Sequence, residues 1–174
     1  MSMPRIGVTG HRKLADVAAI EAEVDAALAA IEARFPEEPL RILSSLAEGA
    51  DRLVARRVLL RPGARLVAVL PLPRLDYMAD FESQQSREEF LGLLGEAETV
   101  IEMPPRDSRP EAYEQAGRYV VEHSDVLVAV WDGLPAQGRG GTAEMVAWAR
   151  GLGKTVFRVW PGGIDEGRYD PILR

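Results

Sequence analysis

The first segment that can bind a ligand is Gly7–Arg12, which begins within a short apolar stretch at residues 5–8 and continues beyond it. Gly10 has no side chain and lets the backbone approach a bound molecule closely, and Thr9 and His11 can form hydrogen bonds with it. Arg12 can pair with a phosphate group. The same residues also suit a tight turn with a solvated arginine.

The second segment, Ser44–Arg52, offers two hydroxyl groups and a glycine just before an expected helix. We expect Ser44, Ser45, Glu48 and Gly49 to face a ligand, because the first turn of a helix presents unpaired N–H groups to anions. Asp51 can contact the ligand, or it can simply cap the helix. The two roles of this segment are compatible.

The third segment follows the apolar stretch 65–70 and contains Tyr77, Asp80 and Phe81. Either aromatic ring can stack on a base, and Asp80 can accept a hydrogen bond from a sugar hydroxyl. Aromatic residues at such positions also commonly pack in the core.

The fourth segment is the richest in candidates. Trp131 and Asp132 end a strongly apolar stretch, and Gly138, Gly140, Gly141 and Thr142 precede a helix. Glycines before a helix start favour an anion held by backbone N–H groups, although they also suit a plain flexible loop. The spacing of Gly138, Gly140 and Ala143 formally satisfies the dinucleotide-binding fingerprint. We discount it, because that fingerprint belongs directly after the first strand.

Apolar stretches alternate with amphipathic ones along the whole chain. This order predicts βαβ units and one Rossmann-like, doubly wound domain over residues 1–174. We expect a mostly parallel sheet of about six strands with helices on both faces, since several stretches are apolar on both sides. In such a sheet ligands bind beyond the carboxyl ends of the strands, where the four segments lie. The expected strands are residues 5–8, 40–44, 65–70, 99–101, 125–131 and 155–159.

Composition narrows the function further. The net charge of −6 argues against nucleic acid as a partner, because backbone affinity comes from clustered Lys and Arg. The chain has no cysteine and only His11 and His123, so we expect no metal site and no required cofactor. No stretch is long and apolar enough to span a membrane, and a cytoplasmic location is the expectation.

Two of these loops resemble those of a known group of proteins. Ser44–Asp51 resembles the Ser-Gly-x-Ala-x-Gly-x-Asp loop of the DprA/Smf and LOG (Lonely Guy) proteins, which belong to the SLOG superfamily. Gly140–Glu144 resembles the helix-opening loop of LOG proteins, and residues 124–154 resemble nucleoside deoxyribosyltransferases. The resemblance implies a nucleoside phosphate ligand, with phosphate at Gly140–Thr142 and base or ribose near Thr9–Arg12 and Ser44–Gly49.

Our leading hypothesis is a sensor or carrier that binds a nucleotide or a derivative such as ADP-ribose. The alternative is an enzyme acting on the N-glycosidic bond of a nucleotide, with Glu144 as nucleophile or base and Asp132 or Asp80 orienting the ribose. The LOG and transferase motifs place their glutamate where Met145 stands, and Glu144 is rotated by roughly 100° from that position. A third hypothesis is a protein-interaction module, with helix faces used for a homodimer or higher homo-oligomer.

Overall fold

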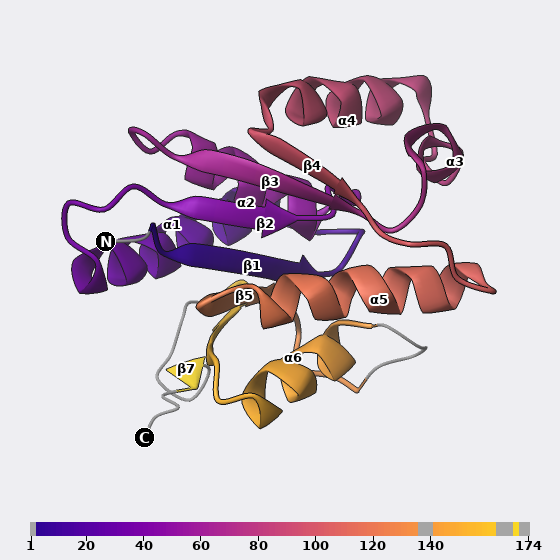
Figure 1. Cartoon of the computed structure of the whole chain (residues 1–174). Helices are drawn as coiled ribbons and strands as arrows, with labels where there is room; N and C mark the ends of the chain where they lie inside the picture. The colour runs from indigo at the N-terminus through magenta and orange to yellow at the C-terminus, as the bar shows by residue number, and fades with distance from the viewer. Residues whose placement is uncertain (1–2, 136–140, 163–168, 171–174) are drawn as a thin grey trace.

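The computed structural model describes residues 3–135, 141–162 and 169–170. Strands and helices alternate along the chain, with two helices between the third and fourth strands (Figure 1). The elements in chain order are β1 (Arg5–Gly10), α1 (Val17–Arg34), β2 (Arg41–Ser44), α2 (Ala50–Leu59), β3 (Arg65–Leu70), α3 (Arg74–Met78), α4 (Gln84–Glu96), β4 (Thr99–Glu102), α5 (Arg109–Glu122), β5 (Val126–Val130), α6 (Thr142–Gly151), β6 (Thr155–Val159) and β7 (Tyr169–Asp170).

The strands form one sheet in the order β4-β3-β2-β1-β5-β6-β7. The strands from β1 to β6 are all parallel, and β7 alone runs antiparallel, against β6. Ile6 of β1 pairs with Ile42 of β2 on one side and with Val126 of β5 on the other. The chain therefore builds outward from β1 to β4 and then returns to place β5 on the far side of β1. The strand order reverses between β1 and β5.

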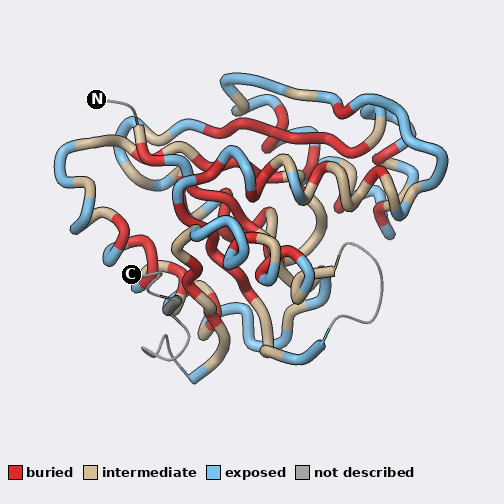
Figure 2. The backbone as a smooth tube through the Cα atoms, turned by 60° about the horizontal axis from the view of Figure 1, so that its bottom comes forward, coloured by how far each residue is buried: buried red, intermediate tan, exposed pale blue. Residues whose placement is uncertain are grey.

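Helices cover both faces of the sheet, as predicted. One face packs against α1, α2 and α4, and the other packs against α5 and α6 (Figure 1). The central strands are therefore buried on both sides, and Figure 2 shows them as the buried centre of the molecule. All five residues of β5 are buried, which explains the uninterrupted apolar run that predicted this strand.

The helix starts differ in a way that matters for the site. Asp16, Ser83 and Ser108 cap α1, α4 and α5 by accepting hydrogen bonds from backbone N–H groups. The N-cap residues of α2 and α6 are Gly49 and Gly141, which supply no side-chain cap. The suggestion that Asp51 caps α2 is therefore corrected, because Asp51 lies inside the first turn. Among the described helices, none is long and apolar enough to cross a membrane.

Candidate functional site

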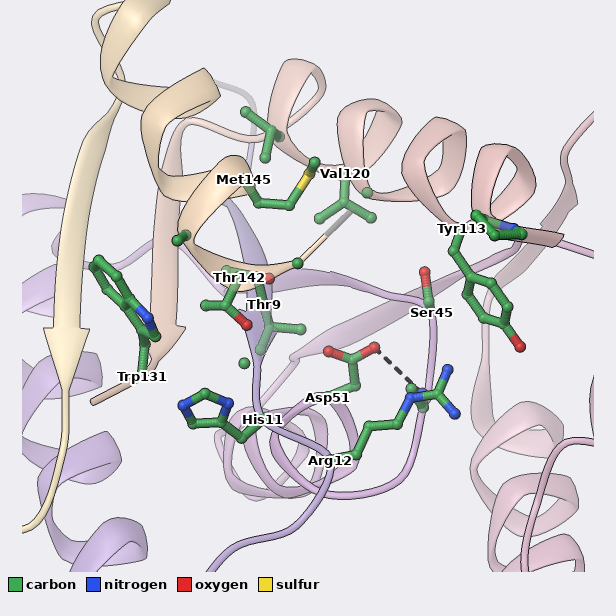
Figure 3. A pocket seen from close by; sticks show the side chains of 18 of the residues that line it. Thr9, His11, Arg12, Ser45, Asp51, Tyr113, Val120, Trp131, Thr142 and Met145 are labelled. Carbon is green, nitrogen blue, oxygen red and sulfur yellow. Dashed lines mark hydrogen bonds between the residues drawn. The ribbon is translucent and has the colours of Figure 1, made fainter. Parts of the chain in front are cut away.

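A cavity of about 630 Å³ opens at the carboxyl ends of β1 and β5, where the strand order reverses (Figure 3). Its walls come from the loops after β1, β2 and β5, from α5 and from the start of α6. The residues that line it include Thr9, Gly10, His11, Arg12, Ser45, Ala47, Asp51, Tyr77, Arg109, Tyr113, Gly117, Trp131, Asp132, Gly141, Thr142 and Met145.

The loop after β1 fits tightly against the start of α2. The backbone N–H of Ala50 donates to the carbonyl of His11 at 3.0 Å. Gly49 has a φ of 85°, and a Cβ there would lie 2.3 Å from the carbonyl oxygen of Arg12. Only glycine permits this approach, so Gly49 serves to seat the Thr9–Arg12 loop rather than to contact a ligand.

The loop after β2 is held by its own hydrogen bonds. The Ser44 hydroxyl accepts from the Leu46 N–H at 3.0 Å and donates to the Asp51 carbonyl at 3.2 Å. The Asp51 Oδ2 atom accepts from the Ala47 N–H at 3.2 Å. Ser44 is fully buried beneath this loop, and Ser45 and Ala47 face the cavity. The backbone of this wall is therefore preorganised before any ligand binds.

Asp51 and Arg12 are the opposed charges at this end of the cavity. Loss of solvation raises the pKa of Asp51 to about 7, although the Ala47 hydrogen bond and the charges of Arg12 and Arg52 act to lower it. Partial burial acts to lower the pKa of Arg12, but a hydrogen bond with Tyr113 and the nearby Asp51 charge leave it raised. The Arg12 guanidinium lies 5.1 Å from the ring centroid of Tyr113.

Trp131 and Asp132 form the opposite wall, after β5. Asp132 Oδ1 accepts from the Leu134 N–H at 2.9 Å and lies 3.4 Å from His11 Nε2. The Leu134 hydrogen bond is the main reason that the pKa of Asp132 is lowered. Arg158 of β6 supports this loop from behind, because its Nη2 donates to the Asp132 carbonyl at 2.9 Å.

The start of α6 closes the cavity. Gly141 and Thr142 line it, whereas Glu144 is exposed and lies outside the lining. Met145 lies inside, packed on α5 so closely that a Cβ on Gly117 would come within 2.7 Å of its Sδ atom. The α6 side chain that faces the cavity is thus the thioether of Met145, and the Glu144 carboxylate is not part of the lining.

The structure brings together ten of the ligand-binding residues that the sequence suggested. They are Thr9, Gly10, His11, Arg12, Ser45, Asp51, Trp131, Asp132, Gly141 and Thr142. Gly138 and Gly140 lie outside the described residues.

Four other candidates are placed elsewhere, and one of them, Ser44, is buried beneath the loop after β2. Glu48 and Gly49 line a neighbouring cavity of about 430 Å³ beside Arg52. Asp80 accepts a hydrogen bond from the Tyr113 hydroxyl and lies 3.3 Å from Arg109 Nη2.

Within the described ranges, no three His, Asp or Glu residues are grouped so that they could hold a metal ion.

Sequence reasoning missed the contribution of α5. Arg109, Tyr113 and Gly117 line the cavity from this helix, together with Tyr77 of α3, which the sequence did suggest. One signal could have found the α5 residues: a helix that connects two parallel strands begins at the carboxyl edge of the sheet, so the first turns of α5 lie beside the strand-end loops.

No protein-family model matches the chain, and no curated protein matches its sequence. Solved structures do match. DNA processing protein A from Helicobacter pylori aligns with a TM-score of 0.59 and 17% identity, covering 89% of this chain and 64% of that protein. The structural-genomics target TM1055 aligns with a TM-score of 0.52 and 16% identity, covering 88% of this chain and 72% of the target.

The molybdenum cofactor carrier protein from Chlamydomonas reinhardtii aligns with a TM-score of 0.50 and 21% identity, covering 90% of this chain and 76% of the carrier. This chain shares a Rossmann-like fold with these three proteins. At such identities the likeness shows the fold alone.

One expectation is corrected by these structures. The acidic net charge suggested that nucleic acid is not a partner, yet the Helicobacter pylori protein, which has this fold, binds single-stranded DNA. Net charge is a sum over the whole surface, whereas phosphate binding depends on local groups such as the N–H groups of a helix start. The exclusion of nucleic acid is therefore wrong as an inference from charge.

Proposed function

We propose that this protein binds a nucleotide or a nucleotide derivative in the cavity between the ends of β1 and β5. The observation that carries the proposal is the meeting of three features at the point where the strand order reverses. A cavity, an α6 start without a side-chain cap, and the Arg12 guanidinium all share this place. Ligands of doubly wound sheets bind at such points, and phosphates bind at helix starts.

The size and lining of the cavity support the same proposal. A volume of about 630 Å³ falls in the range of roughly 300–1,000 Å³ that is typical of small-molecule sites. Apolar residues form its roof, and polar groups enter from the strand-end loops. The backbone N–H groups of Gly141 and Thr142 suit a phosphate, and the wall at Arg12, Asp51 and Tyr113 suits a base.

Binding is favoured over cleavage of the glycosidic bond. In the glycosidic alternative Glu144 is the nucleophile or base, and it would have to lie beside the anomeric carbon. Glu144 is exposed and outside the lining, and Met145 occupies the helix position that faces the cavity. We therefore assign the protein to ligand binding, as a sensor or a carrier.

A thermal-shift screen followed by calorimetric titration tests the proposal. Nucleoside mono-, di- and triphosphates, NAD and ADP-ribose are the probes, together with a single-stranded oligonucleotide. A bound ligand at free concentration L stabilises the fold by RT ln(1 + L/Kd), so the melting temperature rises with the logarithm of the ligand concentration once this exceeds Kd. Mass spectrometry of the recovered ligand then distinguishes binding from turnover.

Two variants connect the shift with this cavity. Arg12→Ala is expected to weaken a nucleotide hit by about tenfold or more, since hydrogen bonds to charged groups contribute about 1.5–3 kcal/mol. Lys13→Ala, whose exposed side chain pairs only loosely with Glu82, is the control and is expected to change nothing. The proposal fails if no nucleotide shifts the wild type, or if the oligonucleotide binds and no nucleotide does.

A further inference from the structure

Asp51 faces the cavity with hydrogen-bonding capacity that the protein does not use. Its Oδ2 atom accepts from Ala47, and this is the single hydrogen bond that its carboxylate makes with the described residues. Figure 3 shows the carboxylate pointing into the cavity. A carboxylate has about four acceptor sites, and removing it from water is costly unless donors replace the lost solvent. Acceptor sites of the Asp51 carboxylate therefore lack hydrogen-bond donors from the cavity wall, and a ligand can supply those donors.

Arg12 supplies the complementary chemistry beside Asp51. Its guanidinium carries donors only, and the two charges interact across the cavity wall. The guanidinium also lies over the ring of Tyr113, so two planar groups that can stack on a base lie at this end of the cavity. An acceptor and a donor placed together, next to planar groups, match the edge of a base that presents an amino group beside an acceptor. A ribose offers hydroxyl groups but no flat surface to stack.

We propose that Asp51 and Arg12 together read the edge of the ligand's base, with Asp51 accepting from an exocyclic amino group and Arg12 donating to the neighbouring acceptor. The ligand class is thus a nucleotide with an amino-bearing base, held in preference to the same nucleotide without the amino group. This inference rests on the proposed function, because it assigns the base end of the same cavity.

Pairs of ligands that differ only in the amino group test the inference. The probes are GMP against IMP, AMP against purine riboside monophosphate, and CMP against 2-pyrimidinone riboside monophosphate. Each is titrated by calorimetry at pH 8, where the Asp51 carboxyl is ionised and accepts hydrogen bonds only. Wild-type protein is expected to bind the amino-bearing member of its preferred pair at least tenfold more tightly. A ligand without the amino group leaves the Asp51 carboxylate without a hydrogen-bond donor. The free-energy cost of that unpaired acceptor corresponds to a difference in affinity of about tenfold or more.

Asp51→Asn is the decisive variant. The amide keeps the shape of the side chain and an oxygen for the Ala47 N–H, but it can present its own donors to the ligand. The preference within the pair is expected to fall below about threefold. Asp107→Asn makes the same chemical change on an exposed loop and is expected to keep the full preference. Circular dichroism and the melting temperature establish that both variants fold.

The outcomes separate this inference from the proposed function. Equal binding of both pair members by the wild type overturns it while nucleotide binding stands. A preference that survives in Asp51→Asn, or that is lost in Asp132→Asn instead, also overturns it. If neither these pairs nor any nucleotide of the thermal-shift screen binds, the proposed function fails as well. Should Asp51→Asn not fold, the wild-type comparison decides alone.

Discussion

The Nε atom of Arg52 donates to the carbonyl of Leu46 at 2.9 Å, and both residues are buried. Leu46 has a φ of 57°, a left-handed conformation that is unusual for leucine. The Nη1 atom of Arg52 also donates to the carbonyl and hydroxyl of Ser86, at 3.0 and 2.9 Å. One side chain of α2 thereby ties α4 to the strained loop that forms a wall of the cavity.

Removing this tie is expected to be costly. Arg52→Ala leaves the Leu46 carbonyl and the Ser86 hydroxyl without their charged donor inside the protein, and we expect a loss of about 3–5 kcal/mol in the free energy of unfolding. Urea denaturation monitored by circular dichroism measures it. Arg56→Ala is the control, because Arg56 is exposed and its pairing with Glu89 is worth less than about 1 kcal/mol. Similar losses in the two variants would contradict this role for Arg52.

The glycine between β2 and α2 offers a second test. Gly49→Ala forces a Cβ to within 2.3 Å of the Arg12 carbonyl at a φ of 85°, so we expect a loss of about 2 kcal/mol or more and weaker nucleotide binding. Gly92→Ala places the same methyl group in the middle of α4, where nothing lies within 4 Å. That change is expected to stabilise the protein by about 0.5–1 kcal/mol. Thermal unfolding of the two variants compares them directly.

Asp51 should make stability depend on pH. Its pKa is raised to about 7 in the folded protein, so the fold binds a proton that the unfolded chain has already released. The resulting stability is fully present below the ordinary pKa of an aspartate and is lost as the pH rises through about 7. The groups that face Asp51 are Arg12, Arg52, Tyr77 and the Ala47 N–H.

The measurement is the free energy of unfolding of wild type and Asp51→Asn at pH 5 and at pH 8. The wild type is expected to lose on the order of a few kcal/mol relative to the variant between these values. Taking the difference removes the other titrating groups, which both proteins share. A difference that is constant with pH would show that Asp51 titrates normally.

The start of α6 distinguishes binding from catalysis. Thr142→Glu adds a negative charge to the cavity beside the expected phosphate, and we expect the affinity for a nucleoside monophosphate to fall at least tenfold. Glu144→Gln changes a neighbouring exposed residue, and the affinity is expected to stay within about threefold. Release of free base by the wild type that disappears in Glu144→Gln would instead support the glycosidic enzyme.

Much of the fold could be predicted from the residues alone, because the signals are local. The uninterrupted apolar run of β5 requires burial on both faces, and that requirement already implies helices above and below the sheet. The alternation of strands and helices then makes the sheet parallel, which gathers the loops after β1, β2 and β5 at one edge. Thr9, Arg12, Asp51 and Thr142 were identified as site candidates on that ground.

Tertiary packing decided which of the candidates meet. The rotation of α6 against α5 turns Met145 rather than Glu144 into the cavity, and the contact with Gly117 sets that rotation. The start of α5 at the carboxyl edge of the sheet brings Tyr113 to the site, where its hydroxyl donates a hydrogen bond to Asp80.

The sequence by itself thus determined the layers of the fold and the edge of the sheet at which the cavity lies, since both follow from hydrophobic periodicity and chain direction. Only the tertiary structure decided which side chains face the cavity and how Asp51 is solvated. Those properties depend on close packing between segments far apart in the chain, and such packing leaves no local pattern.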